Sequence, residues 1–267
     1  MIRSLRAELL KLRRPSIIYG AGGSAAALAL LATIVTFTTA KARPPRVLNV
    51  AASLTTTLGQ LAGSGGLSRG FSIAAGVLGL LVFVLFLTSV TTEYGLGTIR
   101  VMLTRQPARS RLLAGKLLAL VCCAAAALLL AEILSIGAAV ALAHARGIST
   151  AAWFTGTGLR HAATDYANAL ITATCYGVTG AAIGVLVRST PLALGLGIAW
   201  LGPVEHILQL SWSNAANWLP GLLFDAIATG GTATASSYQR ALIFSLVFST
   251  AALTIGAASF LRRDVST

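Results

Sequence analysis

Two acidic positions lie inside long apolar runs of this chain, and they are the first candidates for chemistry. Glu132 is near the middle of one run, and Glu205 stands beside His206, one turn after Pro203 in another. An ionisable group in hydrocarbon is costly and usually faces a partner group or an aqueous cavity. These three side chains are therefore candidates for a translocation path, in contact with substrate or protons. The alternative for Glu132 is a hydrogen-bonded anchor between helices, and for Glu205 and His206 it is the cap of a broken helix near water.

A Gly-x-Ser-x-Gly pattern spans residues 66–70 and puts Ser68 in the place of a hydrolase nucleophile. Such a serine needs a strand before it, a helix after it and a histidine base. Here a Gly/Ser-rich loop precedes it, although His144 or His161 could serve as the base. We expect His161 and Asp165 to be solvated loop residues. A serine hydrolase therefore ranks far below the other interpretations.

Nucleotide and metal sites lack their usual signatures. The pair Gly115-Lys116 is not followed by Ser or Thr, and Ser110 stands where the first glycine of a P-loop should be. The histidines have no metal-ligand spacing, and the three cysteines lie inside apolar runs with no C-x-x-C pair. We therefore expect no catalytic residue, cofactor or metal on this chain, which is not predicted to be an enzyme. Any ATPase that powers it would be another polypeptide.

The composition is that of an integral membrane protein. Hydrophobic residues make up 56% of the chain and charged residues 10%, against about 25% charged in a soluble domain. The net charge of +13 comes from short basic clusters that flank apolar runs. That pattern marks membrane topology and attraction to anionic lipid, and it argues against a nucleic-acid partner.

The apolar runs predict an all-α polytopic protein with six transmembrane helices in a single domain, residues 1–267. The expected spans are about 16–39, 71–90, 117–143, 166–187, 192–210 and 241–261. Gly180-x-x-x-Gly184 in the fourth span predicts close contact with another helix. The fifth span is interrupted at Gly202-Pro203.

Charge asymmetry predicts the orientation. If the N-terminus is cytoplasmic, the inner segments hold 13 Lys and Arg and the outer loops hold 7, so both termini are expected in the cytoplasm. Residues 1–14 read equally well as an interfacial amphipathic helix or as a basic topogenic tail. The apolar stretch 217–228 is too short to cross, and we expect a short re-entrant or interfacial helix before the sixth span.

The segment 93–116 joins the second and third spans and is strongly basic. Between Tyr94 and Arg105 it can form a short, partly amphipathic helix. Pro107 would end that helix, and Ser110 could cap the next one. A short basic helix at the mouth of two spans is suited to dock on a soluble partner and to pass on its movement.

This segment and the layout of the whole chain resemble the permease subunits of bacterial type-2 ATP-binding-cassette (ABC) exporters. The residues that carry the resemblance are Glu93, Gly97-Thr98-x-Arg100, Leu103-Thr104-x-x-Pro107, Arg109 and Gly115-Lys116. The motif covers about a tenth of the chain, whereas the layout covers nearly all of it: a basic amphipathic start, six spans, a broad outer segment before the last span and a basic stop.

The resemblance implies a half-transporter in the bacterial plasma membrane, surrounded by lipid. A second permease subunit, the same chain or a sibling, would complete the path, and separate cytoplasmic ATPase subunits would bind ATP and Mg²⁺. The segment between spans two and three would be a coupling helix. The coupling residues that it implies are Glu93, Gly97, Thr98, Arg100, Arg105 and Arg109. The alternative is that these arginines only fix topology.

Three classes of function compete. The first is an export permease for a hydrophobic or amphipathic compound, such as a drug, an antibiotic or a lipid-like molecule. The second is an ion- or proton-coupled carrier that uses Glu132, for which inverted repeats would be supporting evidence, and none is visible. A membrane-bound enzyme or a structural anchor ranks last, because no catalytic constellation is present.

Overall fold

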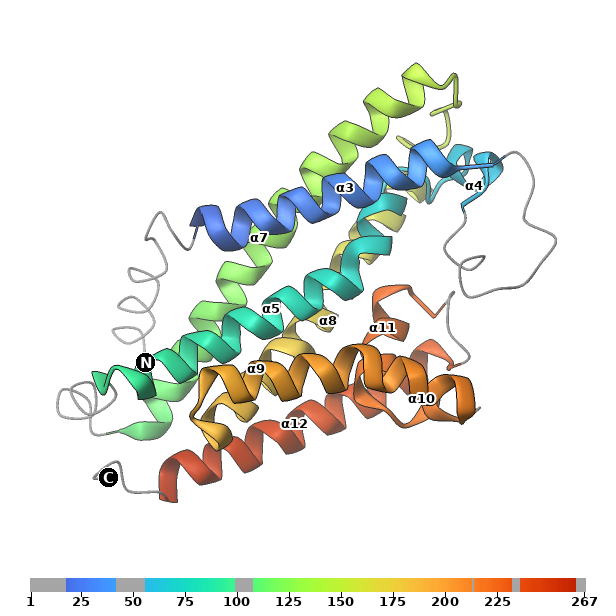
Figure 1. Cartoon of the computed structure of the whole chain (residues 1–267). Helices are drawn as coiled ribbons and strands as arrows, with labels where there is room; N and C mark the ends of the chain where they lie inside the picture. The colour runs from blue at the N-terminus through green and yellow to red at the C-terminus, as the bar shows by residue number, and fades with distance from the viewer. Residues whose placement is uncertain (1–17, 42–55, 99–107, 213, 232–235, 263–267) are drawn as a thin grey trace.

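The computed structural model describes residues 18–41, 56–98, 108–212, 214–231 and 236–262 and consists of helices joined by short connections (Figure 1). The α-helices are α3 (Gly23–Thr39), α4 (Leu58–Ala62), α5 (Arg69–Gly95), α7 (Arg109–Ala145), α8 (Gly156–Val187), α9 (Thr190–Ala199), α10 (Glu205–Ser211), α11 (Pro220–Ala228) and α12 (Tyr238–Arg262). Two π-helical segments, η1 (Ile18–Gly22) and η3 (Trp200–Val204), and one 3₁₀ turn, η4 (Ala215–Asn217), complete the described elements. Within these residues no strand forms, so the predicted all-α class is confirmed.

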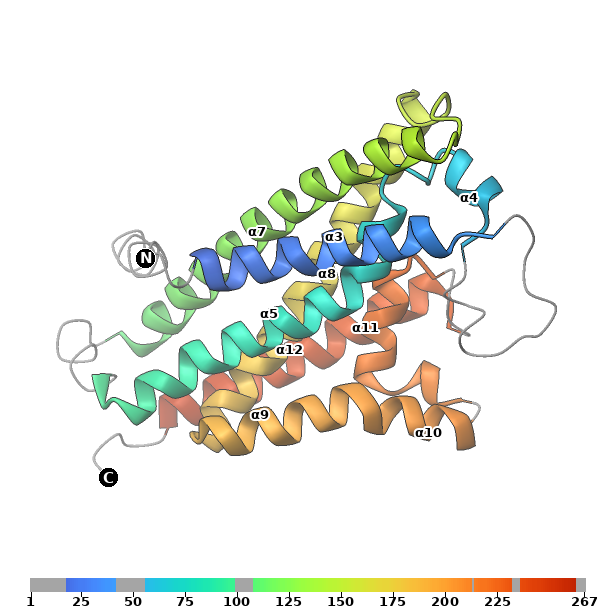
Figure 2. The same ribbon diagram turned by 45° about the horizontal axis from the view of Figure 1, so that its top comes forward.

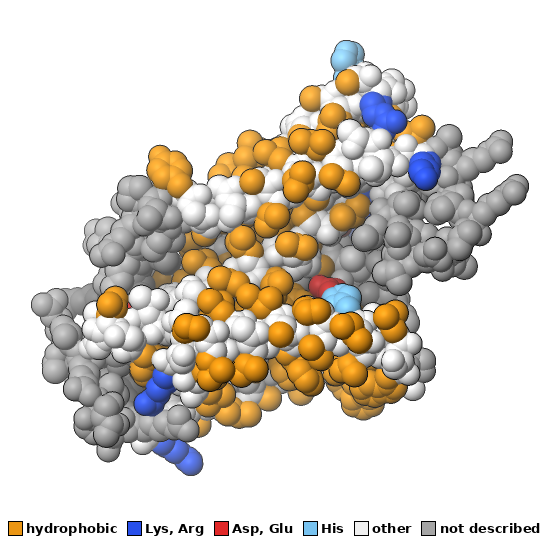
Figure 3. Space-filling view, in the orientation of Figure 1, with side chains coloured by type: hydrophobic (Ala, Val, Ile, Leu, Met, Phe, Trp, Pro, Cys, Tyr) orange, Lys and Arg blue, Asp and Glu red, His pale blue; other side chains and the backbone are white. Residues whose placement is uncertain are grey.

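Six helices are long and apolar enough to cross a membrane, as predicted. They span Tyr19–Thr39, Arg69–Gly95, Ser110–Ala145, Gly156–Val187, Thr190–Ser211 and Tyr238–Arg262. Their outward faces carry large apolar side chains such as Leu130 and Ile133 on α7 and Val247 on α12. Hydrophobic side chains cover the middle of the face in Figure 3, and the Lys and Arg side chains lie towards its two ends. A bilayer satisfies both features, since only its interior solvates such a belt.

The helices run roughly along one another and define two ends of the bundle (Figures 1 and 2). The hairpin end holds the start of α3, the end of α5, the start of α7, the α8–α9 turn and the end of α12. The loop end holds α4, the α7–α8 connection, and α10 with α11. The first and last spans therefore reach the same end, as an even number of crossings requires.

The closest helix pair in the core is α5 with α8, and glycines make it possible. A Cβ added at Gly180 would lie 2.6 Å from the carbonyl oxygen of Phe83, and one at Gly184 would lie 3.2 Å from that of Leu87. A Cβ added at Gly177, one turn earlier, would lie 3.0 Å from the ring of Phe86. Small residues allow the two backbones to approach closely. In lipid, where the hydrophobic effect does not drive helices together, the resulting van der Waals contact stabilises the pair. The predicted Gly180–Gly184 contact is confirmed.

Two helix starts differ from the prediction. α8 begins at Gly156, about ten residues before the expected 166, because Thr155 caps it through the backbone N–H of Gly158. His161 and Asp165 are therefore helical and not loop residues. α7 begins at Arg109 after Ala108, with no side-chain cap, so Ser110 is not the cap that we expected.

The fifth span is interrupted where the sequence predicted. α9 passes into the π-helical segment η3, which contains Pro203, and then into α10. Proline removes a backbone donor and widens the turn, and π-turns of this kind often occur at functional sites. The predicted short helix before the last span is α11; it starts at Pro220 and is buried along almost its whole length. The predicted interfacial helix at 1–14 lies outside the described residues.

The α5–α8 contact gives a stability test. Gly180→Ala should destabilise the protein by about 1–3 kcal/mol, because its methyl group would overlap the backbone of α5. Gly137 is an exposed glycine within α7 with open space around it, so Gly137→Ala should be neutral or stabilise by up to about 1 kcal/mol. Unfolding titrations of both variants in mixed detergent micelles measure the difference. Equal effects at the two positions would contradict the close packing.

Candidate functional site

A buried ion pair closes the base of the α5–α7 connection. The Lys116 ammonium lies 2.7 Å from the carboxylate of Glu93, and these side chains are 5% and 15% exposed. Glu93 belongs to the last turn of α5, and Lys116 to the second turn of α7. A pair so far from water loses stability sharply when one partner is removed, because the other charge is left buried alone. The ends of the two spans are thus fixed to each other.

The α8–α9 turn is fastened to the same end of α5. The Arg188 guanidinium lies over the Tyr94 ring, 5.0 Å from its centroid. The Thr190 hydroxyl donates to the Thr91 hydroxyl at 2.7 Å. Arg188 itself has φ of 56°, the left-handed conformation that ends α8. Three spans therefore meet in one cluster of polar contacts, which we call the hairpin clamp: Thr91, Glu93, Tyr94, Lys116, Arg188 and Thr190.

Three of the expected coupling residues lie beside this clamp. Glu93 is part of it, Gly97 forms the turn after α5 with φ of 64°, and the Thr98 hydroxyl donates to the Glu93 carbonyl oxygen at 3.3 Å. Arg109 is the first residue of α7. Arg100 and Arg105 lie outside the described residues, as does most of the expected short helix. Tyr94 and Gly95, which we placed in that helix, are the last residues of α5.

At the other end of the bundle, Glu205 is completely buried against the start of α11. Its Oε2 accepts a hydrogen bond from the backbone N–H of Leu222 at 3.1 Å. Gly221 permits this approach, since a Cβ there would lie 2.8 Å from the same Oε2 and 2.6 Å from the Leu201 carbonyl oxygen. The second oxygen, Oε1, is buried and accepts no hydrogen bond from any described residue. Glu205 therefore caps the start of α11 through Oε2, and only one of its two carboxylate oxygens is used.

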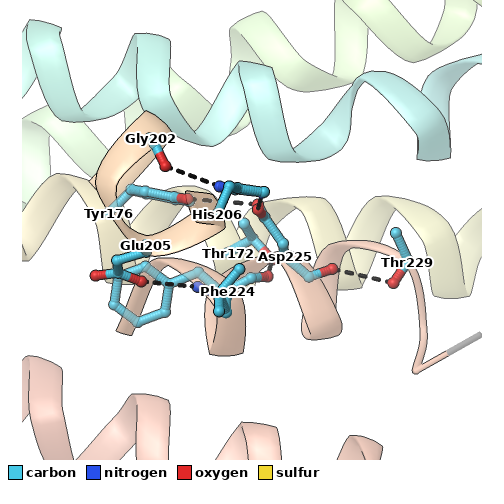
Figure 4. Close-up of polar contacts among 9 residues, drawn as sticks. Thr172, Tyr176, Gly202, Glu205, His206, Phe224, Asp225 and Thr229 are labelled. Atoms are coloured by element: carbon cyan, nitrogen blue, oxygen red, sulfur yellow. Dashed lines mark hydrogen bonds and ion pairs between the residues drawn. The ribbon is translucent and has the colours of Figure 1, made fainter. Parts of the chain in front are cut away.

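His206, the next residue, joins a separate set of contacts (Figure 4). Its Nε2 lies 3.4 Å from an oxygen of Asp225 on α11, and its Nδ1 lies 2.8 Å from the Gly202 carbonyl oxygen. The Tyr176 hydroxyl of α8 donates to the other Asp225 oxygen at 3.4 Å. The side chain of His206 is 53% exposed and that of Asp225 is 26% exposed. Three helices thus converge on one polar cluster at the π-turn of the fifth span.

Glu132 belongs to a different part of the molecule. It is 95% buried on α7, and its Oε1 has no hydrogen-bond partner among the described residues. One turn later the Ser135 hydroxyl shares a buried 2.6 Å hydrogen bond with Thr33 of α3. Glu132 therefore lies beside a polar contact between α7 and α3 and is not part of the Glu205–His206 cluster. Both interpretations of Glu132 remain compatible with this place.

Ser68 makes a contact that excludes the usual catalytic relay. Its hydroxyl is fully buried and donates directly to Asp165 of α8 at 2.6 Å. In a catalytic triad an imidazole lies between the serine and the carboxylate. Here the serine bonds to the carboxylate directly, so no imidazole lies between them. Ser68 instead ties the start of α5 to α8. Within the described part of the chain no three His, Cys, Asp or Glu residues are grouped as metal ligands.

Several important side chains escaped sequence reasoning. Asp225 and Arg188 received no role, since a single charge beside an apolar run reads as a loop or topology residue. Asp165 was expected in solvent and is instead bonded to Ser68. One signal in the sequence could have revealed the Glu93–Lys116 pair. Glu93 is the single acidic residue of the segment 93–116, and Lys116 stands at the segment's other end, where the next span begins.

Comparison of the sequence with protein-family models gives no match, and comparison with curated proteins gives none either. The likeness to ABC exporter permeases therefore depends on the residues at 93–116 and on the layout of the chain.

The hairpin clamp gives a test in free energy. Lys116→Met should cost about 3–5 kcal/mol of unfolding free energy, because the buried Glu93 carboxylate loses its ion pair with the Lys116 ammonium. Adding Glu93→Gln should recover about 1–3 kcal/mol of that loss. Lys41→Met removes an exposed lysine and should change stability by less than about 0.5 kcal/mol. Strict additivity of the Glu93 and Lys116 changes in a double-mutant cycle would show that the pair does not hold the clamp.

Ser68 gives a second test. Ser68→Ala removes a hydrogen bond to a carboxylate and should destabilise the fold by about 1.5–3 kcal/mol. Ser24→Ala, whose hydroxyl bonds only to carbonyl groups of its own helix, should cost less than about 0.5 kcal/mol. The wild-type protein should also resist labelling by a fluorophosphonate. Labelling at Ser68 would instead support a nucleophile.

Proposed function

We propose that this chain is the membrane-spanning permease subunit of a bacterial type-2 ABC exporter. The observation that carries the proposal is the hairpin clamp, which joins the end of α5, the start of α7 and the α8–α9 turn; in the sequence, the basic segment 99–107 connects α5 to α7. A partner that pushes on this segment moves three spans together. The positive-charge asymmetry of the sequence favours a cytoplasmic position for this end. In that position the segment can bind a soluble ATPase, which itself binds ATP and Mg²⁺.

The movement follows from the contacts. Binding of ATP closes the ATPase dimer, and the docked segment transmits that closure to α5 and α7 through Glu93 and Lys116. Because α8 is packed on α5 through glycines, α8 follows, and the α9–α10 span follows α8 through the Arg188 turn. ATP shifts the permease between two states only insofar as the ATPase binds them with different affinity. A second permease subunit, identical or sibling, completes the path.

At the opposite end, α11 fits the role of the re-entrant helix. It is apolar, nine residues long, and inserted between α8, α12 and the π-turn of the fifth span. Buried irregular backbone at membrane depth is tolerated where protein surrounds it. The polar cluster of His206, Asp225 and Tyr176 and the buried Glu205 then lie on the outer side of the membrane, where substrate would leave.

A second candidate is an ion- or proton-coupled carrier, and one observation favours it: a buried oxygen of Glu132 has no hydrogen-bond partner in the part of the chain that the structure describes. The two functions differ in their energy source. A carrier keeps transporting without any ATPase and loses that transport on Glu132→Gln, whereas a permease subunit does neither.

Charge reversal on the basic segment tests the proposal. Arg100→Glu with Arg105→Glu should abolish co-purification of the partner ATPase and ATP-driven transport, while membrane insertion stays normal, because the docking surface changes sign. The matched control is Lys41→Glu with Arg160→Glu, two exposed basic residues at the loop end of the bundle. That control should keep the ATPase bound. Unchanged co-purification of the Arg100/Arg105 variant would refute the proposed docking surface.

A further inference from the structure

An apolar cavity of about 310 Å³ lies between α8, the α9–η3 span, α11 and α12. The residues that form most of its walls are Ile183, Val187, Leu196, Trp200, Pro220 and Phe248. The cavity is distinct from the polar cluster at the π-turn, because neither Glu205 nor His206 lines it. Its size is at the lower end of small-molecule sites.

The chemistry of the walls selects hydrocarbon. Among the described residues that line the cavity none is charged, and Thr179 is the one with a hydroxyl group. That hydroxyl donates to the Cys175 carbonyl oxygen of its own helix at 2.8 Å. A charged or strongly polar group placed here would lose its hydrogen bonds without replacement, which is unfavourable. An apolar cavity of this kind stays dry and takes up apolar groups.

The mouth of the cavity faces the bilayer. On one side it is bordered by Leu196 and Trp200 of the fifth span, which are 60% and 50% exposed, and on the other by the exposed Phe248 of α12. All three residues lie well inside apolar spans, where hydrocarbon is the surrounding medium. The occupant therefore comes from the bilayer and not from water.

The cavity is elongated along the helices. On α8 its lining runs from Thr179 to Val187, eight residues that cover about 12 Å at 1.5 Å per residue. Val187 is the last residue of α8, and the charged Arg188 that follows it marks the edge of the hydrocarbon. The cavity thus extends from near that edge towards the middle of the bilayer. One leaflet contributes about 15 Å of hydrocarbon, so this is the direction, and most of the length, of an acyl chain.

The width of the cavity excludes a protein helix as its occupant. A volume of about 310 Å³ over about 12 Å gives a cross-section of about 26 Å². A helix with side chains is about 10 Å wide and needs about 80 Å². A single hydrocarbon chain is the remaining candidate, and acyl chains are the most abundant such groups at the mouth. Left empty, the cavity would deprive its lining atoms of van der Waals contacts, which a chain restores.

We propose that this cavity binds one acyl chain of a bilayer phospholipid from the leaflet at the hairpin end. The chain lies along α8, between the α9–η3 span and α12, and its head group stays at the membrane edge. The lipid is then part of the packing that supports the fifth span beside its π-turn. This inference goes beyond the proposed function and does not depend on it.

Photo-crosslinking of the full-length chain in nanodiscs of dioleoylphosphatidylcholine tests the proposal. The probe is phosphatidylcholine with a diazirine on one acyl chain, added as a small fraction of the lipid, and crosslinked residues are mapped by mass spectrometry. We expect a crosslink at Ile183, which is half-buried in the cavity wall. Leu118 of α7, an exposed residue near the same end of the bundle, should be labelled by any surrounding lipid. Lipid that only surrounds the protein would label Leu118 and not Ile183.

Two tryptophan variants test whether the chain occupies the cavity. Leu196→Trp fills the mouth and should lower the crosslink yield at Ile183 at least about tenfold. The matched control is Leu31→Trp on α3, at a leucine that is 58% exposed and does not line the cavity. It should leave the yield at Ile183 unchanged. Both changes are on exposed faces, and an unaltered yield at Leu118 shows that each variant is folded in the bilayer.

The contrary results are specific. No crosslink at Ile183 in the wild type, or the same yield there in Leu196→Trp, contradicts the proposal, and so does an equal loss in both tryptophan variants. Hexadecane with the same diazirine represents a free hydrocarbon: if it labels Ile183 and the lipid probe does not, the occupant is not an acyl chain. The measurement needs neither ATP nor an ATPase, so it is independent of the docking test at Arg100 and Arg105.

Discussion

The contact of α8 with α5 through glycine determines how much of this molecule can move as one body. At Gly180 the two backbones are so close that a methyl group would overlap the Phe83 carbonyl oxygen, and at Gly184 a methyl group would be tight against that of Leu87. In lipid the hydrophobic effect gives no reason for two apolar helices to associate, so shape and close contact must do so. These glycines lie in the last third of α8, where it packs on the second half of α5, and the polar contacts at the helix ends depend on this packing. Without it, Ser68 would not meet Asp165 at one end, nor Tyr94 meet Arg188 at the other.

Two candidate functional regions lie at opposite ends of this pair. The hairpin clamp gathers α5, α7 and the α8–α9 turn, and the π-turn of the fifth span gathers Glu205, His206 and α11. The path between them is continuous, since the α8–α9 turn leads directly into the span that carries the π-turn. A helix broken by a π-turn changes shape more readily than a pair of helices in backbone contact. Under the proposed function, force would enter at the rigid end and be released at the more deformable one.

The sequence predicted the number and position of the spans, because the length and hydropathy of an apolar run do not depend on the rest of the fold. It also predicted the Gly180–Gly184 contact and the break at Pro203, both of which depend on local residue type. It could not predict which charges meet. Glu93 and Lys116 pair because α5 and α7 lie side by side, and Asp225 is a partner of His206 because α11 folds back against the fifth span. Helix ends also shifted where a cap decides them, as Thr155 does for α8.

Under the proposed function, the basic segment that joins α5 to α7 faces the cytoplasm and binds a soluble ATPase there. Thr98, which bonds to the Glu93 carbonyl oxygen, marks this position. In a chain whose three native cysteines are replaced by alanine, Thr98→Cys can be probed with a membrane-impermeant maleimide in vesicles of known orientation. We predict labelling in inside-out vesicles alone, and protection when the purified partner ATPase is added. Labelling in right-side-out vesicles would contradict the account.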